Sequence, residues 1–263
     1  MPPVIFTTTY YALLLLFILS LVLSVLNKPG PANACEMTGW LTAALGCVLM
    51  ILITRRLPFA GRFETGMVLI FLISGLNLRY AIPPGVHHLS QRKNTRFLKM
   101  LPHTARQVIN RVVIVALLAF MALGSKATGS EYTMYDNVYV NLFFHFRVLA
   151  TGFFLFAASS FTAAWYSGTG HHGPAPDMDT TGTGRNFLLL GACCFLISEC
   201  AGSWWCLNWL GDVWQWNKGF FKASGVFLMV MTACHLPGCI SKSGPVRLLI
   251  RILPAGICFW MVS

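Results

Sequence analysis

Residues 141–161 read NLFFHFRVLATGFFLFAASSF, and this stretch decides the fold class. Apart from His145 and Arg147 it holds no ionisable side chain, and about 20 apolar residues are what a helix needs to cross a bilayer. Comparable runs follow one another along the chain. We therefore predict an all-α, polytopic transmembrane helix bundle, with candidate spans at 5–26, 38–54, 108–124, 138–166, 187–203, 219–236 and 245–262.

The composition supports this class. Of the 263 residues, 56% are hydrophobic and 10% are charged, and the mean hydropathy is +0.65. Soluble domains carry about 25% charged residues. A soluble enzyme, a secreted disulfide module and a disordered chain are therefore excluded as classes. Because hydrophilic linkers and repeats are missing from the sequence, we expect residues 1–263 to form a single integral membrane domain.

One further segment, 66–84, begins apolar but ends with Asn77, Arg79 and two prolines. If it spanned the membrane, the basic loops 55–65 and 85–107 would lie on opposite sides, against the positive-inside rule. We expect it to be re-entrant or interfacial, which gives seven spans, and eight spans is the alternative. In either arrangement 125–137 and 204–217 share one side, and 167–186 lies on the other.

The net charge of +11 comes largely from loops between apolar runs. Such cations hold loops at the negative face of a membrane and contact anionic lipids, whereas nucleic acid is not expected as a partner. The first 26 residues have no basic region before the apolar run, unlike a signal peptide. We expect a mitochondrial inner membrane or a bacterial plasma membrane. The nine cysteines form no CxxC pair, so no metal site is expected.

His145, Arg147 and Glu199 lie inside apolar runs, and Glu199 is the one acid that we place within a span. A charge in hydrocarbon is costly, so it faces a partner, a polar cavity or another subunit. Arg147 and Glu199 lie on consecutive spans, and we expect them to be paired with each other or with a neighbouring subunit. His145 either bonds a carbonyl or serves as a proton relay or haem ligand.

Tryptophan is concentrated in one place, the run GSWWCLNWLGDVWQWNKG at 202–219, which holds five of the eight tryptophans. An aromatic belt at the membrane interface accounts for such residues. The alternative is a flat aromatic shelf for a planar ligand such as porphyrin or quinone.

The spacing of Trp205, Gly211, Trp214 and Trp216, with His235 further on, resembles the tryptophan-rich signature of the haem-handling proteins of cytochrome c biogenesis. In that family the outer tryptophan loop holds haem and helix-borne histidines ligate its iron. The resemblance implies His235 as an axial ligand, with His145 as its partner. The chain departs from the family's pattern at residues 217 and 218, where Asn-Lys replaces the usual Asp-Pro.

Three functions are compatible with these features. The first is a subunit of a larger, respiratory-type energy-converting complex, with other membrane subunits as partners and a structural or proton-path role in electron transport. The second is haem handling in cytochrome c assembly. The third is a membrane enzyme acting on lipids or isoprenoids, with His235 or Glu199 as base. A non-enzymatic role is favoured, because no nucleotide, hydrolase or metalloprotease motif is present.

Overall fold

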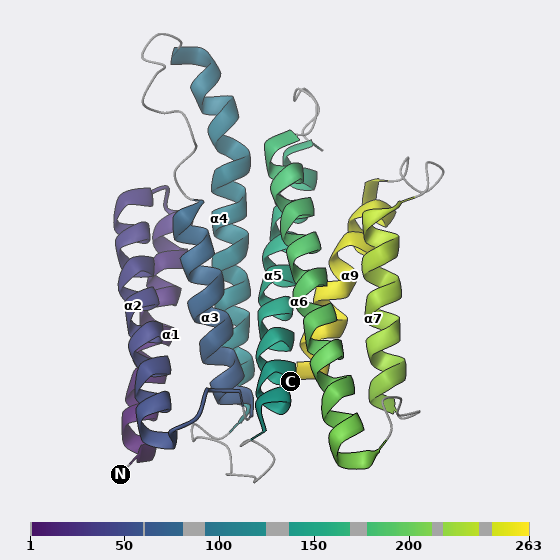
Figure 1. Ribbon diagram of the computed structural model, residues 1–263. Coiled ribbons are helices and arrows are strands. Elements are labelled where there is room, and N and C mark those ends of the chain that lie inside the picture. The colour runs from purple at the N-terminus through teal and green to yellow at the C-terminus, as the bar shows by residue number, and fades with distance from the viewer. Residues whose placement is uncertain are drawn as a thin grey trace.

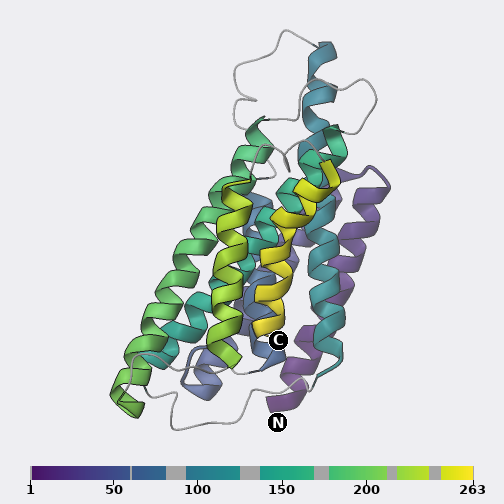
Figure 2. The same cartoon turned by 90° about the vertical axis from the view of Figure 1, so that its right-hand side faces the viewer.

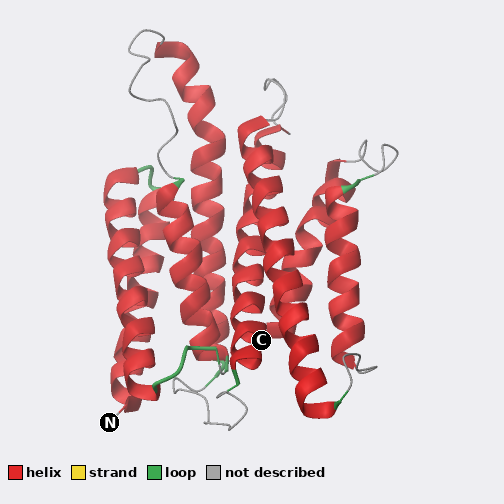
Figure 3. Cartoon of the chain, in the orientation of Figure 1, coloured by secondary structure: helices red, strands yellow, loops and turns green. Residues whose placement is uncertain are grey.

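The computed structural model describes residues 2–59, 61–80, 93–124, 137–168, 178–211, 218–236 and 244–262, without the side chains of 93–104 and of some helix ends. These residues form eight helices. Their bounds are α1 Pro2–Val25, α2 Pro29–Thr54, α3 Arg62–Arg79, α4 Lys93–Ala122, α5 Val138–Gly168, α6 Met178–Leu210, α7 Lys218–Cys234 and α9 Gly244–Val262. Figure 3 shows helices and loops throughout the described part.

The helices run up and down in alternation and form one bundle (Figures 1 and 2). We call the end where α6 finishes at Leu210 the Trp end; it is the lower end in Figure 1. The opposite end, where α6 and α9 begin, is called the basic end. Helix α5 packs against α3 and α4 on one side and against α6 and α9 on the other, so it joins two groups of helices.

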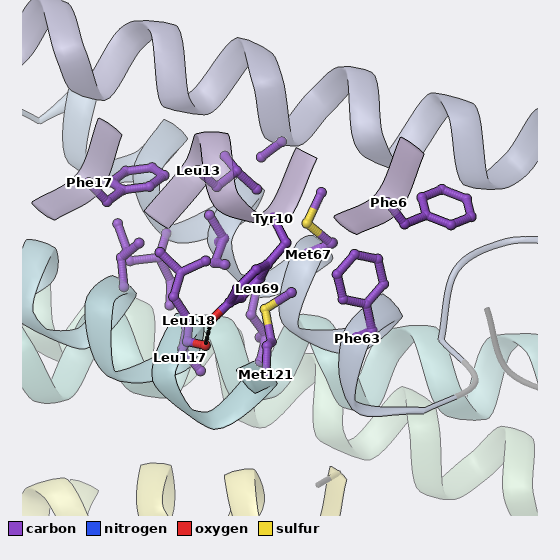
Figure 4. Packing of buried hydrophobic residues seen from close by; sticks show 14 of the residues in the cluster. Phe6, Tyr10, Leu13, Phe17, Phe63, Met67, Leu69, Leu117, Leu118 and Met121 are labelled. Atoms are coloured by element: carbon purple, nitrogen blue, oxygen red, sulfur yellow. Dashed lines mark hydrogen bonds between the residues drawn. The ribbon is translucent and has the colours of Figure 1, made fainter. Parts of the chain in front are cut away.

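The first core lies between α1, α3 and α4. Phe6, Tyr10, Leu13 and Phe17 recur at intervals of three or four residues, which places them on one face of α1. These side chains are buried and point toward α3 and α4 (Figure 4). The Tyr10 hydroxyl donates a hydrogen bond to the Leu118 carbonyl at 3.0 Å, which ties α1 to α4.

The second core joins α5 to α6, α7 and α9 and is rich in buried phenylalanine. Glycines on α6 let α5 approach closely. A Cβ atom at Gly191 would lie 2.6 Å from the ring of Phe154, which is itself buried. Small residues serve this purpose in membrane helices, where close van der Waals packing replaces the hydrophobic effect.

The outer surface of the bundle is apolar: Leu15, Leu52 and Leu228 are each at least 65% exposed. Six helices are long and apolar enough to cross a bilayer, and the apolar part of α7, Phe221–Cys234, is shorter. The expected polytopic helix bundle is confirmed. The candidate spans themselves are Val4–Val25, Pro29–Thr54, Ala105–Ala122, Val138–Tyr166, Thr180–Leu210 and Gly244–Met261.

The segment 66–84 differs from the expectation. Within the described residues it does not double back, because α3 is one continuous helix from Arg62 to Arg79 that links the two ends of the bundle (Figure 1), although α3 is not one of the six helices that are long and apolar enough to cross a bilayer. Its 18 residues give a length of about 27 Å at 1.5 Å per residue. Of the three arginines in the preceding loop, Arg56 forms an ion pair with Glu64 of α3 at 2.8 Å.

Candidate functional site

The lower parts of α5 and α6, near the Trp end, bring together most of the ionisable and aromatic side chains singled out in the sequence. The expected ion pair between Arg147 and Glu199 is present, and it joins these two helices. The Arg147 guanidinium also lies over the Phe143 ring, 4.0 Å from its centroid. The two charges are thus paired with each other within the chain.

The α5–α6 contact continues toward the Trp end along one face of each helix. The Ser198 hydroxyl donates a hydrogen bond to the Phe143 carbonyl at 2.7 Å. A Cβ atom at Gly202 would lie 2.7 Å from the Phe143 ring. Tyr139, one turn from Phe143 on α5, stacks on Trp204 of α6, with ring centroids 6.4 Å apart. Phe143 and Tyr139 on α5, and Ser198 and Gly202 on α6, are four positions apart and so share a helix face, whereas Trp204 is two residues beyond Gly202.

The tryptophans of α6 have different surroundings. Trp204 and Trp209 are 55% and 60% exposed. The indole Nε1 of Trp205 is buried and has no hydrogen-bond partner among the described residues. Gly211 ends the helix in the left-handed conformation, with φ of 72°, which is the usual role of glycine at a helix C-terminus. Trp214 and Trp216 lie outside the described residues.

His145 lies on the other side of α5. It is two residues from both Phe143 and Arg147, so its side chain is rotated by about 200° from theirs. Its ring packs edge-on against Phe59 in the α2–α3 connection, with centroids 4.6 Å apart. Trp205, which shares the α6 face of Ser198 and Gly202, is therefore separated from His145 by α5 itself.

The two ring nitrogens of His145 have distinct partners. Nδ1 lies 2.6 Å from the Asn141 carbonyl oxygen. Because a carbonyl only accepts, we assign the proton to Nδ1, which leaves a lone pair on Nε2. Nε2 is buried and has no hydrogen-bond partner in the described part of the chain. Metal-bound histidines show the same arrangement, with the second ring nitrogen donating to a carbonyl or carboxylate.

The α2–α3 connection holds the ring that contacts His145. Glu64 is buried and accepts two hydrogen bonds from Arg56 at 2.8 Å each. It also accepts the backbone N–H of Phe59 at 3.0 Å. Phe59 in turn stacks on Phe144, with centroids 5.3 Å apart. The His145 ring is thus oriented by a salt bridge that the sequence did not reveal, because loop 55–65 is basic overall and gives no sign that Arg56 is paired.

His235 is far from this site along the bundle. It follows the last residue of α7, at the basic end (Figure 1). Its side chain is exposed, and its Nδ1 lies 3.2 Å from the Met231 carbonyl oxygen. The structure therefore does not bring His235 together with His145 or with the tryptophans of α6, and the implied ligand pair is not formed.

A second polar cluster was missed at the sequence level. Glu36, in α2, is buried and accepts hydrogen bonds from Arg111 at 2.9 Å and Asn77 at 2.7 Å. Asn110 links Asn77 to Ser159 of α5. Glu199 is thus not the one acid within a span. The signal was weak, because Glu36 lies outside the apolar run at 38–54, while α2 begins earlier, at Pro29.

Fold and site together define a multi-pass membrane protein with paired buried charges and a tryptophan-rich end. The sequence matches no protein-family model and no curated protein. The fold is similar to that of a solved structure, cytochrome c haem lyase CcmF, with a TM-score of 0.64 and 15% sequence identity. The match covers 100% of this chain and 51% of that chain, so this chain spans about half its length. The resemblance to haem-handling proteins of cytochrome c biogenesis is thus found in the structure as well as in the tryptophan run.

Proposed function

We propose that the chain is a haem-handling membrane protein of cytochrome c assembly. The observation that carries this proposal is the structural similarity to cytochrome c haem lyase CcmF over the whole of this chain. The tryptophan run at 202–219 supports it independently, because its resemblance to the family rests on sequence spacing alone. Two unrelated observations thus favour the same class of protein.

Of the two histidines implied as haem ligands, His145 fits this role and His235 does not. A bound haem would supply an iron atom with axial positions open to ligands. His145 suits such a position, since its buried Nε2 has no hydrogen-bond partner in the described part and its Nδ1 is already held by Asn141. His235, at the other end of the bundle, does not suit the same haem. We therefore assign ligation of the haem iron to His145, whose ring faces the α2–α3 connection; the exposed Trp204 and Trp209 lie beyond α5 from it and are given no role toward the same haem.

The proposal includes an orientation in the membrane. We infer that all eight helices cross, with the basic end toward the negative side and the Trp end, including the N-terminus, toward the other. Arg79, Arg185, Arg247 and Arg251 support this orientation, because they lie toward the basic end, and cytoplasmic or matrix loops carry an excess of such residues. The orientation is the same in a mitochondrial inner membrane and in a bacterial plasma membrane, so either would suit the chain.

The respiratory-subunit function rests on composition. The respiratory-subunit function also rests on the expectation that isolated buried charges need partner subunits. In the structure, Arg147 pairs with Glu199 and Arg111 pairs with Glu36, both within the chain. A native gel of the gently solubilised membrane distinguishes the two functions. Migration with respiratory complexes would favour a respiratory subunit. Migration with cytochrome c assembly proteins would favour the haem-handling function.

The haem proposal is tested by spectroscopy on protein purified under haem-replete conditions. We expect a Soret band in the wild type, loss of most of it in His145→Gly, and its return when external imidazole fills the space. His235→Ala is the matched control and should keep the band, because its side chain is exposed at the opposite end. A wild type without a Soret band would overturn the proposal, whereas a band that survives His145→Gly unchanged would remove His145 as ligand.

A further inference from the structure

A cavity opens at the basic end, away from the tryptophans and from His145. Its volume is about 130 Å³, and residues of α5, α6 and α9 line it. Two of the lining residues are arginines, Arg247 and Arg251, one helical turn apart on α9. Residues four positions apart lie on the same helix face. Both guanidinium groups therefore belong to one side of this cavity.

The arginines lack a carboxylate partner among the described residues, whose three ion pairs all lie elsewhere. Arg251 packs over the ring of Phe161, 4.8 Å from its centroid. Its Nε is buried and has no hydrogen-bond partner in the described part. Arg185 and Arg247 both lie close enough to repel it. Like charges that lie together beside one cavity, with a buried donor unused, favour the binding of an anion.

The backbone adds to the positive potential. Gly244 is the first residue of α9 and Thr181 the fourth residue of α6, and both line the cavity. Two helix N-termini therefore meet there, and each brings the positive end of a helix dipole toward the cavity. The indole nitrogen of Trp165 lies beside Gly244, 3.6 Å from where a Cβ atom would stand.

Apolar residues line one side of the cavity, and exposed apolar residues follow on the adjoining helix surface. Leu248 and Phe161 line it, and Tyr166 and Leu249, next to lining residues in the chain, are 65% and 55% exposed. A ligand with a phosphate group and hydrocarbon chains suits this combination, because the phosphate meets the arginines while the chains remain in the bilayer.

We propose that this cavity binds a phosphate-type oxyanion, either the headgroup phosphate of an anionic phospholipid or free phosphate. Arg247 and Arg251 bind its oxygens through charge-assisted hydrogen bonds, and the helix dipoles of α6 and α9 add to the attraction. The site is independent of the haem proposal, since it shares no residue with it.

The test compares binding of phosphatidylglycerol, phosphatidylcholine and inorganic phosphate to delipidated full-length protein, by native mass spectrometry and by isothermal calorimetry. We expect the wild type to bind phosphatidylglycerol about tenfold or more tightly than phosphatidylcholine, a difference of about 1.4 kcal/mol. Arg247→Gln/Arg251→Gln should abolish this preference, and Arg247→Lys/Arg251→Lys should keep part of it. Arg79→Gln, which removes an exposed arginine from the same end, is the matched control.

The outcomes separate the two sources of the oxyanion. Displacement of phosphatidylglycerol by millimolar phosphate assigns the site to the free anion, and failure to displace it assigns the site to the lipid.

Asp177 and Asp179 precede Thr181 in the chain, and their side chains lie outside the described residues. Asp177→Asn/Asp179→Asn should leave binding unchanged or tighter. Equal binding of all three probes by wild type and Arg247→Gln/Arg251→Gln, or loss of binding in the aspartate variant, would overturn the proposal.

Discussion

Arg111 has the most completely satisfied charge among the described side chains of this bundle. Its guanidinium pairs with Glu36 at 2.8 Å and donates hydrogen bonds to Asn33 and Ser24. Only 2% of the Arg111 side chain is exposed. Arg147 has one ion-pair partner, Glu199, and that partner is 32% exposed. The two arginines therefore offer a comparison between a fully enclosed charge and a partly solvated one.

We predict that Arg111→Leu lowers stability more than Arg147→Leu. Breaking a buried pair leaves Glu36 as an enclosed charge, at a cost of about 3–5 kcal/mol. Hydrogen bonds to a charged group are worth about 1.5–3 kcal/mol, which is the loss expected at Arg147. The measurement is the yield of monodisperse protein and its midpoint of thermal unfolding in detergent. Equal loss in the two variants would contradict the ranking.

One of these two ion pairs could be predicted from the sequence, and the other could not. The Arg147–Glu199 pair was predictable because each side chain interrupts an apolar run, and the two runs are consecutive. The Glu36–Arg111 pair was not, since the partners are 75 residues apart and Glu36 precedes the apolar run of its helix. The pairing of His145 with His235 failed because spacing along a sequence does not say at which end of a bundle a residue lies.

The contact between α5 and α6 is the most extensive contact between two helices in the described part of the chain. Helix α6 begins at Met178 and ends at Leu210, so it extends beyond the apolar run at 187–203 at both ends, through segments that contain glycine, threonine and tryptophan. Apolar content located every described helix except α3, whose charges at both termini conceal a buried middle. Helix ends were less predictable, since polar residues at the membrane surface are compatible with helix and loop alike.

We predict opposite results for two glycine-to-alanine substitutions. Gly191→Ala should weaken the α5–α6 contact by about 1–3 kcal/mol, because overpacking forces the helices apart. Its new Cβ atom would lie 2.6 Å from the Phe154 ring and 3.3 Å from the Ala150 carbonyl oxygen. Gly225→Ala, in α7, meets nothing within 4 Å. It should be neutral or stabilising by about 0.5–1 kcal/mol through helix propensity. Thermal unfolding of both variants provides the measurement, and a stable Gly191→Ala would show that α5 and α6 are not tightly packed.

Whether α3 crosses the membrane decides on which side each connection before α3 lies. With α3 crossing, the connection after α2 and the end of α6 lie on the same side of the membrane. With a re-entrant segment they would lie on opposite sides. The structure favours the first arrangement, since both positions are at the Trp end (Figure 1).

We therefore predict that Leu57→Cys and Leu210→Cys react with a membrane-impermeant thiol reagent from the same side. Both side chains are exposed, at 46% and 60%. Lys28→Cys, at the basic end, should react from the opposite side only. The unsubstituted chain controls for labelling of its native cysteines. Reaction of Leu57→Cys and Leu210→Cys from opposite sides would restore the seven-span topology.

The burial of Glu36 against Arg111 has a consequence for how the chain is made. The partners are separated by 75 residues, and ribosomes add about 5–20 residues per second, so about 4–15 s pass between the synthesis of one and of the other. During that interval α2 enters the membrane with a carboxyl group whose ion-pair partner does not yet exist. A carboxylate is much more costly in hydrocarbon than its neutral acid. The nascent helix must therefore carry an extra proton, or wait beside the insertion machinery, until α4 arrives.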